Sequence, residues 1–233
     1  MPGRLLDLKL TLIFLDWLKP LKLNLEYHVE KHKVFMQFDD IRVGSLRLPI
    51  QADFEETKME IIPQEKNWLL IMVRAGIASV GYFEDGENIE HKVFRSYMVR
   101  KKQGKSQVKY LKTKGKSRAG SRLRLASTTL FFKDINDKVN GYLQKYHIDK
   151  IGISCSKTLW PFLFNDKNNL ELDNKDPRLI KIPRHVQNPT YESLLDTNRF
   201  LTHAELTWEE EFSHLFLPFF ETRENNDLEM EDW

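Results

Sequence analysis

A glutamine and a glycine within a dense run of cations are the residues of this sequence whose types and spacing best suit chemistry. Gln107 carries a neutral amide that can orient water or hydrogen-bond to a ribose hydroxyl without titrating, and backbone N–H groups in such a loop can stabilise a developing oxyanion. Gly104 permits the backbone conformations that a loop tip needs to enter a narrow cavity. The same residues suit a solvated RNA-binding loop without a catalytic member, so composition alone leaves both interpretations open.

The cations around this pair are concentrated in one stretch. Between His91 and Lys133 there are fourteen Lys or Arg residues and no Asp or Glu, so a chain with a formal net charge of +2 carries −12 outside this stretch. A polyanion is the natural partner of such a segment. We therefore predict RNA-binding roles for twelve side chains: Arg95, Arg100, Lys101, Lys102, Lys105, Lys109, Lys112, Lys114, Lys116, Arg118, Arg122 and Arg124.

Other catalytic schemes have weaker support. Cys155 lies in an apolar run without a basic neighbour, which favours a core thiol over a nucleophile. His91 approaches the cations along a predicted strand, where a lone histidine is more often structural than a general base. His28 and His32 have the spacing of metal ligands but lie in a strand-like sequence without an acidic third ligand. Because the sequence also has no Walker-type phosphate loop and no dinucleotide fingerprint, we predict no metal and no cofactor.

Three apolar runs before the cations predict an antiparallel meander. Trp68–Arg74 is almost continuously apolar, which is typical of a strand covered on both faces. Ile77–Phe83 forms a second run, and Ile89–Tyr97 forms a third that leads into the cations. Asp85 and Gly86 between them suit a turn that reaches positive φ.

The cation-rich segment itself predicts a loop followed by a helix. Gln103–Ala119 has no apolar periodicity and a charge every second or third residue, which indicates a long mobile loop. Apolar residues then recur at roughly helical spacing, with Ser117 or Ser121 as the predicted N-cap. Arg122 and Arg124 would lie on the first helical turn, beside the loop.

Further elements follow this helix. Ile148–Cys155 and Leu179–Ile182 predict two more strands, the second ended by Pro183. Thr190 is a suitable N-cap for a helix from Tyr191 to about Leu206.

The N-terminal part predicts a short helix and then strands. Residues 4–18 indicate an amphipathic or buried helix rather than a signal peptide or a membrane span, because Asp7 and Asp16 interrupt or flank the apolar run. Alternation between Leu21 and Pro63 predicts two or three strands. The single cysteine excludes an intramolecular disulfide and favours a reducing, cytoplasmic location.

The C-terminal end is acidic and aromatic. From Glu205 onward there are ten acidic residues against one cation, Arg223. We predict a tail that is mobile or that docks through Leu215–Leu217 and Phe219–Phe220. By charge complementarity, we hypothesise that it covers the basic segment in the free protein.

Several separated motifs, in order, resemble the Vms-like release-factor domain, and the similarity runs from Lys66 to Leu206. The motifs are Phe94–Gln107, Arg118–Arg124, Phe132–Ile135, Asp176–Pro183 and Pro189–Leu194. Members of that family resemble the central, peptidyl-tRNA-cleaving domain of eukaryotic and archaeal class I release factors. The resemblance implies an α+β fold with a ribonuclease-H-like mixed sheet flanked by helices.

The resemblance also assigns roles to residues. It implies that Gln107 is the catalytic glutamine, that Gly104 is the loop glycine and that Ser106 matches the residue before the glutamine. It matches Arg100 and Lys102 to basic residues leading into the loop. The implied function is release of nascent chains from tRNA on obstructed large ribosomal subunits, by ester hydrolysis or by cutting tRNA near its 3′ CCA end.

We therefore expect three consecutive parts: a strand-rich extension (1–62), a release-factor-like catalytic domain (63–206) with a basic loop at 100–120, and an acidic tail (207–233). The expected activity is peptidyl-tRNA hydrolase in ribosome rescue. The expected partners are the large ribosomal subunit, ribosomal RNA and peptidyl-tRNA, with no membrane. The alternatives are a non-catalytic ribosome-binding or RNA-binding module and a metal-independent endonuclease acting at the tRNA 3′ end.

Overall fold

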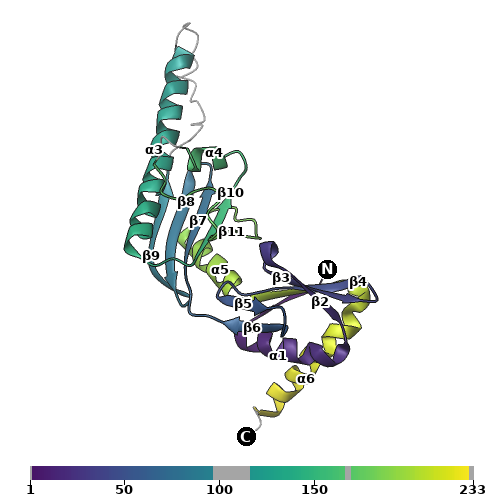
Figure 1. Cartoon of the computed structure of the whole chain (residues 1–233). Helices are drawn as coiled ribbons and strands as arrows, with labels where there is room; N and C mark the ends of the chain where they lie inside the picture. Colours follow the sequence, from purple (N-terminus) through teal and green to yellow (C-terminus); the bar gives the residue numbers. More distant parts are fainter. Residues whose placement is uncertain (1, 97–115, 166–168, 231–233) are drawn as a thin grey trace. The chain divides into compact units, whose positions relative to one another are not determined.

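The computed structural model describes residues 2–96, 116–165 and 169–230, with the backbone alone described for 116–127 and 223–230 (Figure 1). The chain forms two compact units. One consists of residues 66–198, and the other joins residues 1–65 to residues 199–233.

The unit of residues 66–198 is built on a mixed five-stranded sheet in the order β11-β10-β7-β8-β9. Strands β7, β8 and β9 are antiparallel neighbours, whereas β10 and β11 run parallel to β7. The strands are β7 Asn67–Arg74, β8 Ile77–Glu84, β9 Glu87–Arg95, β10 Lys150–Cys155 and β11 Leu179–Lys181. The predicted meander is confirmed, and the turn between β8 and β9 has φ values of 46° at Asp85 and 89° at Gly86.

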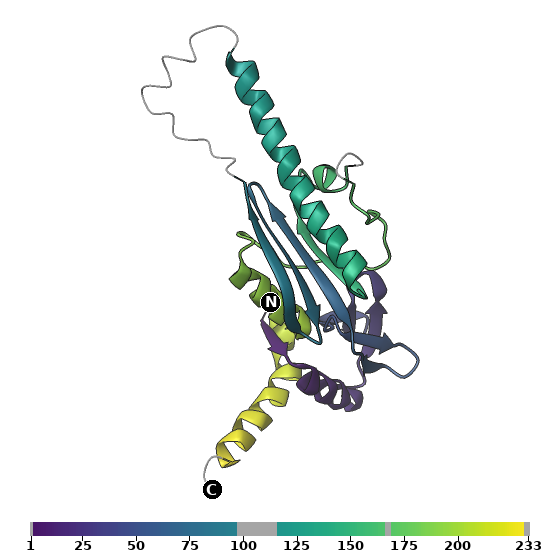
Figure 2. The same ribbon diagram turned by 90° about the vertical axis from the view of Figure 1, so that its left-hand side faces the viewer.

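Helices cover both faces of this sheet. Figure 2 shows α3 (Lys116–Lys145) on one side and α5 (Tyr191–Thr202) on the other. Phe132, Ile135 and Val139 of α3 join one apolar core with alternate residues of β7 and β8. On the opposite face, Leu194 of α5 lies over Gly81. The α+β fold is therefore confirmed, and the sheet has the ribonuclease-H-like arrangement that the resemblance implied.

Helix α3 begins earlier than predicted. Its first residue is Lys116, so Ser117 and Ser121 lie inside the helix and neither caps it, because a cap requires non-helical backbone. Arg122 and Arg124 consequently lie beyond the first turn. Of the predicted loop, residues 116–119 are helical, since Lys and Arg are good helix formers, and the remainder lies outside the described residues.

Helix α5 ends earlier than predicted. Its N-cap is confirmed: the Ser193 N–H donates to Thr190 Oγ1 (3.3 Å), and the Thr190 N–H donates to Ser193 Oγ (2.9 Å). The helix ends at Thr202, and Ala204–Trp208 form strand β12 instead of continuing it. The cause is the pairing of this segment with β1 and β4, and the alternating burial along 204–208 is that of a strand.

The side chain of Arg47 supports this end of α5. The nearly buried guanidinium donates from Nη2 to the carbonyls of Phe200 (2.8 Å) and His203 (2.9 Å). These bonds satisfy carbonyls that a helix end leaves without partners.

The second unit, residues 1–65 with 199–233, is an antiparallel sheet in the order β1-β12-β4-β3-β2, with a separate hairpin of β5 and β6. Its elements are β1 Gly3–Leu6, α1 Leu8–Leu18, β2 Asn24–His28, β3 Lys33–Phe38, β4 Ile41–Arg47, β5 Ala52–Glu55, β6 Glu60–Pro63, β12 Ala204–Trp208 and α6 Ser213–Met230. Short 3₁₀ turns lie at Lys19–Leu21, Val29–Lys31 and Glu210–Phe212, and the first unit adds helix α4, Trp160–Leu163.

The predicted N-terminal helix is shorter than residues 4–18. Gly3–Leu6 form a strand, and α1 starts after Asp7, whose carboxylate Oδ1 accepts from the Leu10 N–H (2.6 Å). No helix among the described residues is long and apolar enough to span a bilayer.

The C-terminal segment docks into the second unit. Phe216 and Phe219 of α6 are buried in the same core as Phe14 and Trp208. Strand β12 lies between β1 and β4, so the segment after residue 198 completes a sheet that the N-terminus begins. The division expected from the sequence placed cuts after residues 62 and 206, whereas the compact units meet at 65/66 and 198/199.

Candidate nucleic-acid interface

The predicted catalytic and RNA-binding residues fall into three groups, according to how far the structure describes them. Gly104, Ser106 and Gln107 lie outside the described residues, together with Arg100, Lys101, Lys102, Lys105, Lys109, Lys112 and Lys114. Arg95 is exposed at the last position of β9. Lys116, Arg118, Arg122 and Arg124 lie on the N-terminal half of α3, where the backbone is described.

Two neighbouring elements hold the ends of the cation-rich segment. Strand β9 leads into it, and the Ser96 N–H just beyond the strand donates to the Gly76 carbonyl (2.9 Å). Helix α3 leads out of it and lies against β8 and β9, with its N-terminal part extending beyond the sheet (Figure 1, Figure 2). The described residues on either side of 97–115 therefore lie toward the same end of the sheet, with Lys116 at the tip of the helix beyond it.

Glu90 fastens β9 to the C-terminal half of α3. Its carboxylate accepts from the Tyr146 hydroxyl (3.0 Å), from Lys145 Nζ (3.2 Å) and from Lys138 Nζ (3.4 Å). Hydrogen bonds from Tyr146 and Lys145, together with the charge of Lys138, lower the pKa of the Glu90 carboxyl below its ordinary value of 4.5. The ionised form is thus the one that holds the strand and the helix together.

Glu90→Gln is expected to lower the thermal midpoint at neutral pH. Because the folded-state pKa of Glu90 is lowered, its stabilisation is complete above the ordinary value of 4.5 and is lost as the pH falls through the folded value. The difference in midpoint between the native chain and Glu90→Gln should therefore shrink below pH 4.5. Glu87→Gln, an exposed change on the same strand, is the control; a pH-independent gap for Glu90→Gln would contradict this role.

A ladder of amides on α3 fastens a second segment. Asn136, Asn140 and Gln144 are spaced four residues apart, so they lie on one helix face. Asn136 donates to the Leu163 carbonyl (2.9 Å), and Asn140 both donates to the Asn169 carbonyl (2.6 Å) and accepts from the Glu171 N–H (2.8 Å).

Gln144 completes this ladder by donating to the Glu171 carboxylate at 3.0 Å. The ladder fixes the rotation of α3 along its C-terminal half. The sequence analysis missed these residues, although the four-residue spacing of amides was a signal that could have revealed them.

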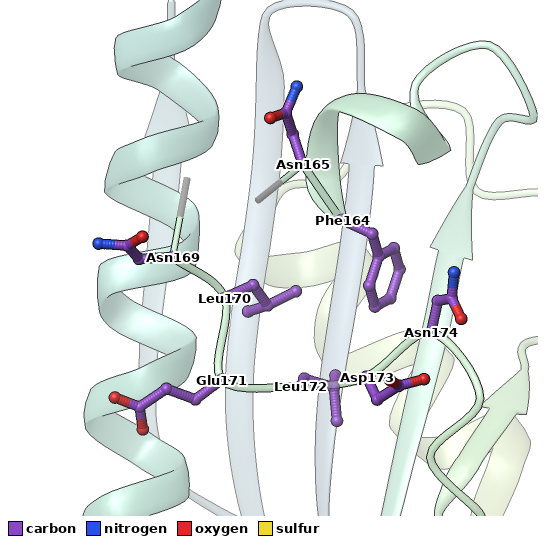
Figure 3. Close-up of a pocket in the computed structure, with 8 residues that line it drawn as sticks. All are labelled: Phe164, Asn165, Asn169, Leu170, Glu171, Leu172, Asp173 and Asn174. Carbon is purple, nitrogen blue, oxygen red and sulfur yellow. The ribbon is translucent and has the colours of Figure 1, made fainter. Parts of the chain in front are cut away.

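A hollow of about 460 Å³ lies beside this ladder (Figure 3). Figure 3 shows the side chain of Asn165 pointing up and those of Asn169 and Glu171 pointing to the left, so the three do not converge. Glu171 is already held by Gln144. A specific ligand site needs a few convergent polar groups, so we place no chemistry in this hollow.

The other sequence candidates have structural roles. Burial raises the pKa of the Cys155 thiol to about 11, so it stays protonated at neutral pH and lacks the reactivity of a thiolate. The His32 ring contacts the Tyr27 hydroxyl through Nδ1 (2.8 Å) and the Pro49 carbonyl through Nε2 (3.0 Å). His28 lies edge-on to Phe35, and no group of three potential metal ligands occurs within the described ranges.

Two curated proteins and one solved structure are similar to parts of this chain. Human and bovine proteins named tRNA endonuclease ANKZF1 are 28% identical over 133 residues and 27% identical over 158 residues, covering 55% and 66% of this chain. The chain spans only 18% and 22% of the length of these relatives. A solved structure described as the Vms1 mitochondrial localization core aligns with a TM-score of 0.42 and 14% identity, over 80% of this chain and 92% of that one.

A sequence model of one protein family matches the part of the chain that forms the mixed sheet and its helices. The sequence model of the Bacteroidetes VLRF1 release factor matches residues 68–209, more than half of the chain. The match runs from the start of β7 to the end of β12 and includes the whole cation-rich segment. The resemblance to the Vms-like release-factor domain is thereby confirmed, and the chain belongs to the Bacteroidetes VLRF1 release factor family.

Proposed function

We propose that this protein is a ribosome-rescue factor that cleaves peptidyl-tRNA on stalled large ribosomal subunits. The observation that carries the proposal is the family match across residues 68–209, within which Gly104 and Gln107 lie amid the cations between β9 and α3. The proposed partners are the large subunit, its ribosomal RNA and peptidyl-tRNA, which places the reaction in the cytoplasm. The catalytic part is the unit of residues 66–198.

In the proposed site, the cations bind the RNA and Gln107 takes part in the reaction. The twelve cations bind RNA phosphates, a contact that supplies affinity and register without reading sequence. Gln107 orients water toward the ester that joins the peptide to tRNA. Gly104 permits the backbone conformations that the segment needs to enter a narrow cavity. Ser106 lies next to the glutamine and helps to present it. Glu90 and the amide ladder support this proposal because they fix β9 and α3, from which the segment departs.

A second candidate function is cleavage of tRNA itself near the 3′ CCA end. The observation that favours it is the name tRNA endonuclease carried by the human and bovine relatives. In that reaction a ribose 2′-hydroxyl of the substrate attacks the adjacent phosphate and forms a 2′,3′-cyclic phosphate. The P–O5′ bond breaks, the 2′-hydroxyl loses its proton and the departing 5′-oxygen gains one, and Gln107 positions that ribose instead of water.

The experiment that tests both is analysis of the tRNA 3′ end after reaction with large subunits carrying peptidyl-tRNA. We expect the peptide to be released with the CCA end intact, because a neutral amide suits the positioning of water at an ester. Release with a shortened 3′ end would support the second candidate instead. Binding to the subunits without release would contradict both functions and indicate a non-catalytic module.

A further inference from the structure

Two aromatic rings lie stacked at the edge of the mixed sheet, on the face opposite α3. The imidazole of His91 on β9 and the phenol ring of Tyr191 on α5 have centroids 3.8 Å apart and planes 12° apart. His91 is exposed and Tyr191 is partly exposed. His91 Nδ1 also lies 3.1 Å from Asn88 Oδ1, which restrains the ring. A restrained aromatic pair, with His91 exposed, therefore lies on the strand that leads into the cations.

The fold builds this pair through a close approach of helix and strand. Gly81 of β8 pairs with His91 in the sheet. A Cβ at Gly81 would lie 2.5 Å from Leu194 Cδ2 and 3.1 Å from Phe83 Cε2, so the glycine leaves the space that these two side chains fill between α5 and the sheet. The reciprocal hydrogen bonds of Thr190 and Ser193 fix where α5 begins, at Tyr191 directly after the Thr190 cap. The stacked geometry thus follows from packing of the core beneath it.

The cationic residue Arg95 lies on the same face of β9 as His91. Arg95 is four residues after His91, and alternate residues of a strand point to the same face. Arg95 is exposed, and it is the last strand residue before the cation-rich segment. The carboxylate of Glu192 has its pKa lowered by its own backbone N–H and by the Thr190 hydroxyl, with a smaller contribution from the charge of Arg95. Arg95 therefore lies near the stacked pair, within electrostatic reach of the first turn of α5.

We propose that His91 and Tyr191 form a stacking platform for an unpaired RNA base, and that Arg95 contacts the phosphate next to that base. Proteins that bind single-stranded RNA place bases on aromatic and imidazole planes and bind the adjoining backbone with cations. The positive charge of the segment that follows β9 favours a polyanion over a neutral partner, and the aromatic pair beside it favours an unpaired base over an acidic peptide as the occupant. This inference deepens the proposed function and rests on it, since the 3′ end of tRNA is single-stranded.

The test is the affinity of the full chain for a short labelled single-stranded RNA ending in CCA, measured by fluorescence anisotropy beside a duplex RNA of the same length. His91→Ala is expected to weaken single-strand binding about fivefold or more, as the loss of one base–aromatic stack would. Duplex binding should change less than about twofold, because phosphate contacts dominate there. The control is Ile89→Ala, which removes an exposed apolar side chain from the same strand without removing an aromatic plane.

Equal losses for single-stranded and duplex RNA, or no loss for either, would overturn the platform. If His91→Ala lowers the thermal midpoint, His91→Phe and His91→Leu replace it. Phe keeps an aromatic plane over Tyr191 and should bind single strands like the native chain, whereas Leu keeps only the apolar contact and should bind like Ala. Equal binding by these two variants would mean that the stack serves only to hold α5 on β9.

Failure of this inference is distinguishable from failure of the proposed function. Oligonucleotide binding does not require cleavage, so the same measurements are made in a Gln107→Ala background. If the native chain releases peptide but His91→Ala binds single strands normally, the platform is wrong and the proposed function stands. If the native chain releases no peptide but His91→Ala loses single-strand selectivity, the platform is retained as an RNA site and the cleavage assignment falls.

Discussion

Gln107→Ala should lower the rate of peptide release from stalled large subunits about 100-fold or more, the cost typical of removing one positioned polar group from a transition state. Affinity for the subunits should change by less than about twofold, because the substitution removes no charge and phosphate contacts supply the binding. Release is followed by the appearance of free peptide, and binding by co-sedimentation. The expected pattern is a large loss of rate with binding preserved.

Gln103→Ala is the matched control for this change. Gln103 lies in the same cation-rich segment and carries the same amide, but it precedes Gly104 rather than following it at the spacing of the family's glutamine. It should release peptide at nearly the native rate. An equal loss in both variants would indicate a general disturbance of the segment, and normal release by Gln107→Ala would remove Gln107 from the mechanism.

The mixed sheet could be predicted because its local signals agree with its burial. Trp68–Val73 is continuously apolar in the sequence, and all six residues are buried in the central strand β7. The Asp85-Gly86 turn has the backbone that its residue types favour. Strand β12 could not be predicted in the same way, since Ala204–Trp208 follow a helix directly and acquire strand geometry only by pairing with β1 and β4. Such pairing joins segments far apart in sequence, which a local pattern does not reveal.

For the candidate site too, the sequence reveals the residue types but not the contacts between them. The density of cations and the order of the motifs are properties of the sequence, and they were sufficient to point to RNA. The contacts that hold β9 and the C-terminal half of α3 in place are tertiary: Glu90 meets Lys145 across 55 residues, and Asn140 meets Asn169 across 29. The stack of His91 on Tyr191 likewise joins two residues that lie far apart in the sequence. Residue types suggest the chemistry, whereas packing decides which side chains meet.

Deletion of the acidic C-terminal segment is a poor test of its charge, because the segment contributes to a core. Deletion of residues 207–233 would test whether its charge competes with RNA for the cations. In the structure, however, that range includes Trp208 of β12 and the buried Phe216 and Phe219, so the deletion would remove part of a core. Neutralising the exposed Glu210 and Glu211 keeps the core and changes only charge, and it is therefore the sharper test of competition.

Phe216→Ala should destabilise the unit of residues 1–65 and 199–233 by about 3–5 kcal/mol, the usual cost of removing a buried phenylalanine from a core. Phe216 is 0% exposed and has ring neighbours in Phe14 (6.4 Å between centroids) and Trp208 (5.6 Å). Its loss would leave a cavity between α1, β12 and α6. Unfolding in urea is followed by tryptophan fluorescence, to which Trp17 and Trp208 of this unit contribute.

Leu217→Ala is the matched control, because this neighbouring side chain on the same helix is 37% exposed. It should cost about 1 kcal/mol or less, as surface substitutions usually do. A segment that merely trails from the domain would make the two variants equivalent, and equal urea midpoints would contradict the docked arrangement. A much lower urea midpoint for Phe216→Ala than for Leu217→Ala would instead show that one side of α6 packs against a core. In that case residues beyond the family match are needed for the fold of the N-terminal strands, and truncating them would disturb more than their charge.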